Sequence, residues 1–307
     1  MSEEKKFIRF MSVRKLAAVV SALAVVASIL ILSVKGLNFG LDFTGGTLIE
    51  VIYEESPVLQ EVRDSLADEG FENAIVVNFG ADTDVLVRLP QGLSPELGDK
   101  VLSVLRAGSA GDVELRRIEF VGPQVGEELR EQGGLAVLMA LVVVLIYVAM
   151  RFQVKFAFGS VLALAHDVII TLGAFALVGW DFDLTVLAAI LAVIGYSLND
   201  SIVVADRIRE NLRGMRGYSP EDIINISLTD TLSRTLITSG TTLMVLVALA
   251  LVGGEMIHSF ALALLVGIGV GTYSSIFVVA SLLVAMKISP EDLIVPEKEG
   301  AEIDDLP

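Results

Sequence analysis

One aspartate lies inside a stretch of sequence that is otherwise apolar enough to cross a membrane. Asp200 falls within residues 184–205 and is flanked by Asn199 and Ser201. A carboxylate at bilayer depth costs about 2.5–3.5 kcal/mol, so it is normally paired, hydrated through a cavity or protonated. We therefore expect Asp200 to have a partner and to bind and release a proton.

The next apolar stretch, residues 230–252, offers that partner. Arg234 shares one helical face with hydroxyl side chains at steps of three and four residues, namely Thr231, Thr235, Thr238, Thr241 and Thr242. An arginine that faces an aspartate across two helices, with hydroxyls to carry water between them, is what a proton path requires. Because arginine keeps its own proton, Arg234 would act electrostatically on Asp200. The alternative is a structural pair that fixes the register of two helices.

The residues around Asp200 are secondary candidates for the same path. Asn199 and Ser201 could bind water or a neighbouring helix, and Thr238 belongs to the polar stripe beside Arg234. Tyr196 lies one turn before Asp200 on the same face, where it is either a plug or a packing residue.

A second acidic residue, Asp167, lies near the middle of residues 156–178 and follows His166 directly. An aspartate at that depth is a functional candidate by default, although it could simply hydrogen-bond inside a helix bundle. Adjacent helix positions do not face each other, so we expect no internal His166–Asp167 pair.

Two membrane aspartates also raise the possibility of an intramembrane aspartyl protease, in which two carboxylates on facing helices share a proton. The nearest relative of the expected Gly-x-Gly-Asp stretch is residues 267–269, which lacks the acid. No cluster supports a serine, cysteine or zinc hydrolase. The sequence therefore does not favour an enzyme.

Three long motifs resemble the SecF proteins of the SecD/SecF protein-export family, which is part of the resistance-nodulation-division superfamily. Residues 195–211 (GYSLNDSIVVADRIREN) are similar to the fourth membrane helix of that family, and residues 232–242 (LSRTLITSGTT) to the fifth. The motif after the first apolar stretch, residues 40–46 (GLDFTGG), contains Gly40, Asp42, Gly45 and Gly46 and also matches. Independently of the resemblance, these glycines favour a tight turn.

Composition narrows the class of protein. The chain has 307 residues, 54% of them hydrophobic, no cysteine and a net charge of −16, and its mean hydropathy is +0.72. These values predict a polytopic membrane protein. We expect no metal site and no cofactor, because thiolates are absent and the two histidines are far apart in sequence. We also expect no nucleic-acid partner, because the basic surface that phosphate binding needs is missing.

The hydropathy pattern predicts six transmembrane helices and one external α+β domain. The predicted spans are residues 16–34, 133–150, 156–178, 184–205, 230–252 and 257–286. Residues 36–132 alternate between strand and helix patterns in the order β-α-β-β-α-β, which is the ferredoxin-like arrangement, with a turn at residues 80–84. Residues 206–229 are expected to form a basic loop and a short connector helix, and residues 287–307 an acidic tail.

Lysine and arginine decide the expected orientation. They gather in residues 1–15, between the second and third spans and between the fourth and fifth spans, whereas the short loops after the third and fifth spans contain none. Excess Lys and Arg mark cytoplasmic segments, so we expect both termini in the cytoplasm. The external domain would then be periplasmic, in a multi-pass protein of a bacterial inner membrane.

The resemblance implies a role that composition cannot give. A SecF-like chain would act with SecD beside the SecYEG channel, with YajC as a possible further partner. It would use the proton gradient to help an unfolded preprotein across the lipid membrane, with Asp200 and Arg234 as its proton-path residues. Two alternatives stay open: a small-molecule exporter of the resistance-nodulation-division class, and a passive assembly subunit in which Asp200 and Arg234 only stabilise a complex.

Overall fold

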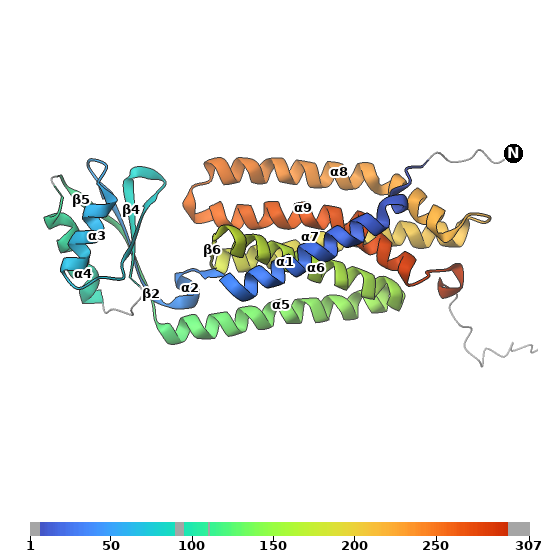
Figure 1. Ribbon diagram of the computed structural model, residues 1–307, viewed down its shortest axis with the longest axis horizontal. Helices are drawn as coiled ribbons and strands as arrows, with labels where there is room; N and C mark the ends of the chain where they lie inside the picture. Colours follow the sequence, from blue (N-terminus) through green and yellow to red (C-terminus); the bar gives the residue numbers. More distant parts are fainter. Residues whose placement is uncertain (1–6, 90–94, 110, 294–307) are drawn as a thin grey trace, which may run out of the picture.

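A helical bundle and a small α/β domain lie end to end along the long axis of the molecule (Figure 1). The computed structural model describes residues 7–89, 95–109 and 111–293. Most of the predicted tail, residues 287–307, and the first six residues of the predicted N-terminal segment therefore lie outside the described residues.

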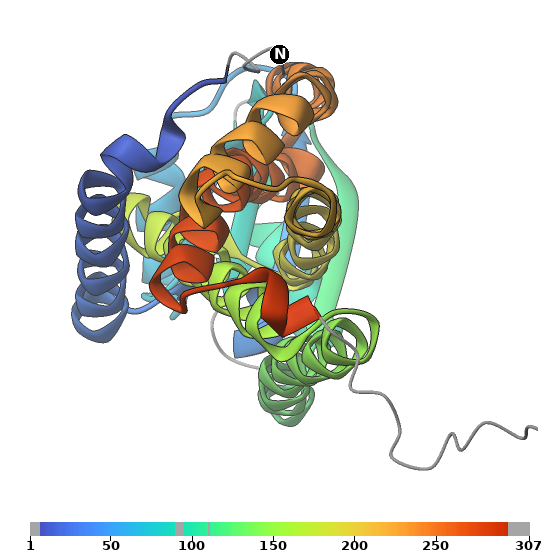
Figure 2. The ribbon, with the colours of Figure 1, turned by 90° about the vertical axis from the view of Figure 1, so that its right-hand side faces the viewer.

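Six helices form the bundle, and all are long and apolar enough to cross a membrane. They are α1 (Arg14–Lys35), α5 (Pro123–Arg151), α6 (Val154–Val178), α7 (Leu184–Gly214), α8 (Pro220–Val252) and α9 (Glu255–Ala285). The apolar windows of α6, α7 and α9 are 44–50% buried, against 11–17% for α1, α5 and α8. The first three therefore form the centre of the bundle, with the other three around them (Figure 2). This arrangement, with the external α/β domain, confirms the predicted fold class.

Three helices are longer than the hydropathy pattern indicated. Helix α5 begins at Pro123 instead of residue 133, because Pro is well suited to a first helical turn and the polar residues that follow continue the helix outside the apolar window. Helix α7 continues to Gly214, so most of the expected basic loop is helical. Helix α8 begins at Pro220, where the Ser219 hydroxyl accepts from Asp222 N, and runs without a break through the fifth span. The connector at residues 220–229 is thus the first part of α8 and not a separate helix.

The external domain has the strand order of a ferredoxin-like fold. Its elements are β2 (Gly46–Tyr53), α3 (Leu59–Asp68), β3 (Ile75–Phe79), β4 (Ala81–Leu89), α4 (Pro95–Ala107) and β5 (Val113–Val121). The sheet order is β3-β4-β2-β5, and every neighbouring pair is antiparallel. Apolar side chains such as Val51, Leu66 and Val101, all fully buried, form the core between the sheet and its two helices.

The turn expected at residues 80–84 is shorter than predicted. Strand β4 already begins at Ala81, which pairs with Phe79, and Gly80 between them has a φ of +91°. Glycine adopts positive φ without a steric penalty, so one residue suffices to reverse the chain and residues 81–84 join the sheet.

A compact junction connects the bundle with the domain. Strand β1 (Asn38–Phe39) pairs in parallel with β6 (Asp181–Phe182), and the one-turn helix α2 (Leu41–Thr44) follows. Gly40 N donates to Phe182 O at 2.8 Å, and Asp42 Oδ2 accepts from Leu184 N at 3.0 Å. Asp42 therefore binds one of the free N–H groups at the start of α7, where a negative charge is also favoured.

Gly45 is a residue of this junction that should tolerate substitution poorly. Its φ of +68° and ψ of 171° are accessible almost only to glycine, and an added Cβ would lie 2.8 Å from Pro123 Cα. We expect Gly45→Ala to destabilise the protein by about 1–3 kcal/mol or more. Thermal unfolding in detergent should rank Gly45→Ala below Gly36→Ala, which has a similar backbone conformation but open space around it. Gly134→Ala, on a helix with open space, should match the wild type, and equal melting of all three variants would contradict this account.

The last described turn folds back onto the start of α6. In the 3-10 helix η2 (Pro290–Leu293), Asp292 Oδ2 accepts from Lys155 Nζ at 2.7 Å and from Ser289 N at 2.8 Å. The hydrogen bond from the Lys155 ammonium group, aided by Ser289, holds the pKa of the Asp292 carboxyl below its usual value. A lowered pKa in the folded state means that this contact stabilises at neutral pH and is lost as the pH falls through that pKa.

We therefore expect the segment 286–293 to open in acid. Hydrogen–deuterium exchange, corrected for the intrinsic rate, should show protection of this segment at neutral pH and loss of protection well below about pH 4, the usual range of an aspartate. Asp292→Asn should lack protection at both pH values. Protection that persists in acid would show that Asp292 does not hold the turn.

Candidate functional site

Asp200 is buried between three helices, and two of them supply a hydroxyl to it. Its side chain on α7 is 5% exposed. Thr235 of α8 donates to Oδ1 at 3.3 Å, and Ser275 of α9 donates to Oδ2 at 3.5 Å. Both distances are long for hydrogen bonds between oxygens, so the carboxylate is held loosely. The side chain is thus partnered on both oxygens by neutral groups.

Arg234 does not pair with Asp200 in the part of the chain that the structure describes. The polar residues predicted to share one face of α8 lie on two faces, one buried and one exposed. Arg234 and Thr235 are neighbours in sequence, and neighbouring positions on a helix are about 100° apart. Thr231 and Thr235 point into the bundle and are buried, whereas Arg234 and Thr238 are exposed. The hydroxyl beside Arg234, and not the guanidinium itself, reaches the carboxylate.

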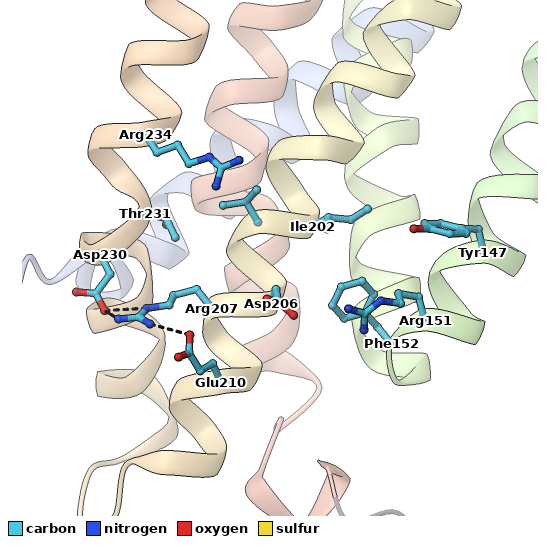
Figure 3. A pocket seen from close by; sticks show the side chains of 11 residues that line it. Tyr147, Arg151, Phe152, Ile202, Asp206, Arg207, Glu210, Asp230, Thr231 and Arg234 are labelled. Atoms are coloured by element: carbon cyan, nitrogen blue, oxygen red, sulfur yellow. Dashed lines mark hydrogen bonds and ion pairs between the residues drawn. The ribbon is translucent and has the colours of Figure 1, made fainter.

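Arg234 instead borders an open cavity of about 530 Å³ between α5, α7 and α8 (Figure 3). The cavity lies toward the end of the bundle farthest from the external domain. Its lining is rich in charge and includes Arg151, Asp206, Arg207, Glu210, Asp230, Thr231 and Arg234. Arg207 binds Asp230 through Nε at 3.0 Å and Nη2 at 2.5 Å, and Glu210 through Nη1 at 2.7 Å.

This cavity lies next to the environment of Asp200. Thr231, one helical turn before Thr235, is both part of the lining and buried. A charged, open cavity holds water, and a hydroxyl can pass hydrogen bonds between that water and a buried group. Thr231 therefore lies between the cavity and the turn of α8 whose Thr235 contacts Asp200.

The remaining candidates around Asp200 lie elsewhere. Asn199 is exposed, and Tyr196 is half-buried with its hydroxyl 3.4 Å from Thr242 Oγ1. Ser201 is fully buried, and its hydroxyl has no hydrogen-bond partner among the described residues. Thr238 donates to the Arg234 and Thr235 carbonyls of its own helix. None of the four contacts the carboxylate.

His166 and Asp167 do form a pair, contrary to the expectation from their adjacency. His166 Nδ1 lies 2.9 Å from Asp167 Oδ1, and both side chains are buried. The rule that adjacent positions diverge holds for Cβ directions, but an imidazole and a carboxylate are long enough to turn toward each other beyond Cβ. Asp167 Oδ2 in turn accepts from Ser197 at 2.6 Å and Ser274 at 2.8 Å.

The partners of both aspartates include serines that the sequence did not single out as site residues. Ser197 precedes Asp200 by one turn of α7, and Ser274 and Ser275 are neighbours on α9. They can reach the carboxylates because α9 packs tightly on α7. A Cβ on Gly271 would lie 3.0 Å from Ser197 Cβ, and one on Gly267 would lie 2.8 Å from Val193 Cγ1. The spacing of small residues on α9 was the available signal, and such spacing marks close helix packing in membranes.

The motif of Gly40, Asp42, Gly45 and Gly46 belongs to the junction between the external domain and the bundle, where Figure 1 shows α2 next to β2, and not to the hydrogen-bonded surroundings of Asp167 and Asp200. Among the residues that the structure describes, no three His, Cys, Asp or Glu side chains are grouped so that they could hold a metal ion.

Two protein-family models match this chain. The family "Protein export membrane protein SecD/SecF, C-terminal" matches residues 100–289, and the "SecD/SecF GG Motif" family matches residues 30–55. The chain belongs to the SecD/SecF family. It is a transport protein and not an enzyme, which sets aside the aspartyl protease alternative.

Relatives place the chain among the SecF subunits of that family. It is 54% identical to the protein translocase subunit SecF of Vibrio alginolyticus, over 99% of this chain and 98% of the relative. The SecF subunit of Pseudomonas aeruginosa is 49% identical, over 98% of both chains.

Two solved SecDF structures share the fold. The crystal structure of SecDF from Thermus thermophilus, a translocon-associated membrane protein, has a TM-score of 0.83 and 39% identity. A SecDF structure in a super-membrane-facing form has a TM-score of 0.69 and 41% identity. Each alignment covers 94% of this SecF-type chain but only 40% of the SecDF chain, so SecDF contains much that this chain lacks.

Close packing of α9 on α7 should be sensitive to a single methyl group. We expect Gly267→Ala to destabilise the SecF-type bundle by about 1–3 kcal/mol, because the new Cβ overlaps Val193. Gly269→Ala is the matched control, since it lies on the same helix and a Cβ there meets nothing within 4 Å. Thermal unfolding in detergent measures the difference, and a Gly267→Ala protein as stable as Gly269→Ala would show that the two helices are not in tight contact there.

Proposed function

We propose that this SecF-type subunit acts with SecD to couple the proton gradient to preprotein translocation, and that Asp200 binds and releases the proton. The observation that supports this most is a buried carboxylate, 5% exposed, whose partners are two neutral hydroxyls beside a charged, open cavity. These partners leave the carboxylate without a fixed counter-charge. Hydroxyls suit a group that changes charge, because each can donate to the ionised form and accept from the protonated form.

Arg234 has an electrostatic role in this proposal. It faces the cavity one position away from Thr235, whose hydroxyl donates to Asp200. A guanidinium closer to Asp200 would favour the ionised carboxylate, and one held away favours protonation. Movement of α8 relative to α7 would therefore change the proton affinity of Asp200, which is the coupling that a transporter needs.

An exposed polar surface supports SecD as the partner. Asn199 of α7 and Arg234 and Thr238 of α8 are exposed in this subunit, although they lie within helices that span the membrane. Exposed polar side chains at this depth are costly in lipid, so they ordinarily face another protein or water. A second bundle supplied by SecD would cover them. We extend the proposal to two further partners, the SecYEG channel, where an unfolded preprotein would be received, and YajC.

The distribution of charge supports the proposed orientation. Basic residues lie at the end of the bundle opposite the external domain, among them Arg14, Arg151, Lys155, Arg209 and Arg213 (Figure 1). By the positive-inside rule this end faces the cytoplasm, with both termini. The external domain then lies in the periplasm of a cell with an inner membrane.

The proposal requires the external domain to move relative to the bundle. Between described residues, Arg88 of the domain and Asp181 of the bundle loops form an ion pair at 3.7 Å, and a cavity of about 450 Å³ is lined by Arg116 of the domain and by the Gly253–Gly254 loop. The Asp181 side chain is 49% exposed, and a partly exposed ion pair contributes little, about 0–1 kcal/mol. Proton-dependent shifts in the bundle could thus change the position of the domain that would contact the preprotein.

No observation favours the small-molecule exporter.

The test is gradient-dependent translocation in vesicles that contain the SecYEG channel, SecD and this chain. Asp200→Asn should reduce stimulation by the gradient to the level of vesicles without the chain. Thr235→Val, which loses one hydrogen bond of about 1 kcal/mol, should give a reduction of about five-fold. Ser201→Ala is the matched control, because Ser201 is the neighbouring buried residue and its hydroxyl has no partner among the described residues.

Copurification with SecD distinguishes the passive alternative. Stimulation that survives in an Asp200→Asn protein that still copurifies with SecD would assign the carboxylate a structural role and refute the coupling proposal.

A further inference from the structure

A second buried carboxylate lies in the same bundle, and the proposed function does not use it. Asp167 of α6 is fully buried, and both of its oxygens have partners on three helices. Oδ1 pairs with His166 Nδ1, whereas Oδ2 accepts from Ser197 of α7 and Ser274 of α9. Hydroxyl donors at Oδ2 favour an ionised carboxylate, and one proton then lies in the Nδ1–Oδ1 contact.

The Nε2 atom of His166 is available to bind one more proton. Its side chain is 7% exposed, and Nε2 is buried with no hydrogen-bond partner among the described residues. The ring stacks on Tyr273 at 6.3 Å between centroids. The Tyr273 hydroxyl is anchored on α1, where it donates to Ala17 O and contacts Ser21 Oγ, each at 3.0 Å. The imidazole is thus fixed in orientation while one of its two nitrogens stays unused.

Protonation of His166 Nε2 would change the net charge of the His166–Asp167 pair. With Nδ1–H donating to an ionised Asp167, the pair carries one negative charge in a buried site. A second proton on Nε2 makes an imidazolium, and the pair becomes a neutral ion pair in which both ring nitrogens are protonated. Uptake of a proton therefore removes an uncompensated buried charge, and its release restores that charge.

Among the described side chains of the neighbouring helices, no other charged group contacts Asp167. Helices α1, α5, α7 and α9 pack against α6. Their described charged side chains lie toward helix ends, with Asp200 of α7 as the exception. Their other titratable side chains are Tyr147, Tyr196, Tyr273 and His258, and of these described residues Tyr273 is the one whose ring stacks on His166.

The two carboxylates are linked through adjoining residues of two helices. On α7, Ser197 binds Asp167 one turn before Asp200. On α9, Ser274 binds Asp167 and its neighbour Ser275 binds Asp200. A change of charge at either aspartate would therefore alter the hydroxyls that hold the other.

We propose that His166 and Asp167 form a second proton-binding site, in which Nε2 of His166 takes up the proton and Asp167 stabilises the imidazolium. The site acts on Asp200 through Ser197, Ser274 and Ser275. Proton binding by His166 does not depend on the proposed function of Asp200, whereas its use in transport rests on that function.

Nitrogen NMR tests proton binding directly. The chain has two histidines, so His258→Gln leaves His166 as the only signal of a protein labelled with ¹⁵N-histidine and kept in lipid nanodiscs. Between about pH 8 and about pH 5, where histidine ordinarily changes its charge, we expect Nε2 to move from the shift of a bare nitrogen to that of a protonated one. Nδ1 should stay protonated throughout. A ring that keeps one state across this range would overturn the proposal.

Two variants test the roles of the neighbours. In Asp167→Asn, which removes the counter-charge, Nε2 should stay unprotonated over the same range, and protonation unchanged from the parent would refute the role of Asp167. In Asp200→Asn, position 200 carries no charge at any pH, so the pH range over which Nε2 takes up its proton should differ from that of the parent. An unmoved midpoint would refute the link. These readouts need no translocation, so they stay distinct from a failure of Asp200 to couple transport.

Discussion

A carboxylate can lie inside an apolar helix bundle only where other helices bring it hydrogen-bond donors, and this requirement organises the centre of the protein. Helix α9 meets it for both aspartates, through Ser274 and Ser275. Those serines reach their targets because Gly267 and Gly271 let α9 approach α7 closely. Small residues thus do two things here: they allow the helices to touch, and they expose hydroxyls at the contact.

The same requirement explains how the protein differs from a simple ion-paired bundle. A buried Asp–Arg pair would satisfy both charges, and separating it would be costly. Here Asp200 has neutral partners and Arg234 lies in the cavity, so neither group is fixed by the other. The arrangement keeps the distance between them free to change. In this arrangement Thr235 makes the contact between α8 and α7, while its neighbour Arg234 remains exposed and is not held against Asp200.

Sequence patterns located the aspartates but not their partners. Hydropathy identified six spans, and the strand and helix periods gave the βαββαβ domain, because both signals arise from burial along a single element. Which neighbour reaches Asp200 depends on the rotation of α8, and a stripe that included both Arg234 and Thr235 could not separate them. The His166–Asp167 pair was missed for a related reason, since backbone spacing does not report how two side chains turn. Helix ends beyond the apolar window, such as Pro123, carried no hydropathy signal.

The junction ties the base of the external domain to the helix that carries Asp200. Asp42 binds the start of α7 and is three residues from Gly45, where the chain turns into β2. Phe182 of β6, which pairs with β1, is two residues before Leu184 at the start of α7. A shift of α7 along its axis would therefore be passed through the junction to the base of the domain, and a small movement there would become a larger movement at the far end of the domain.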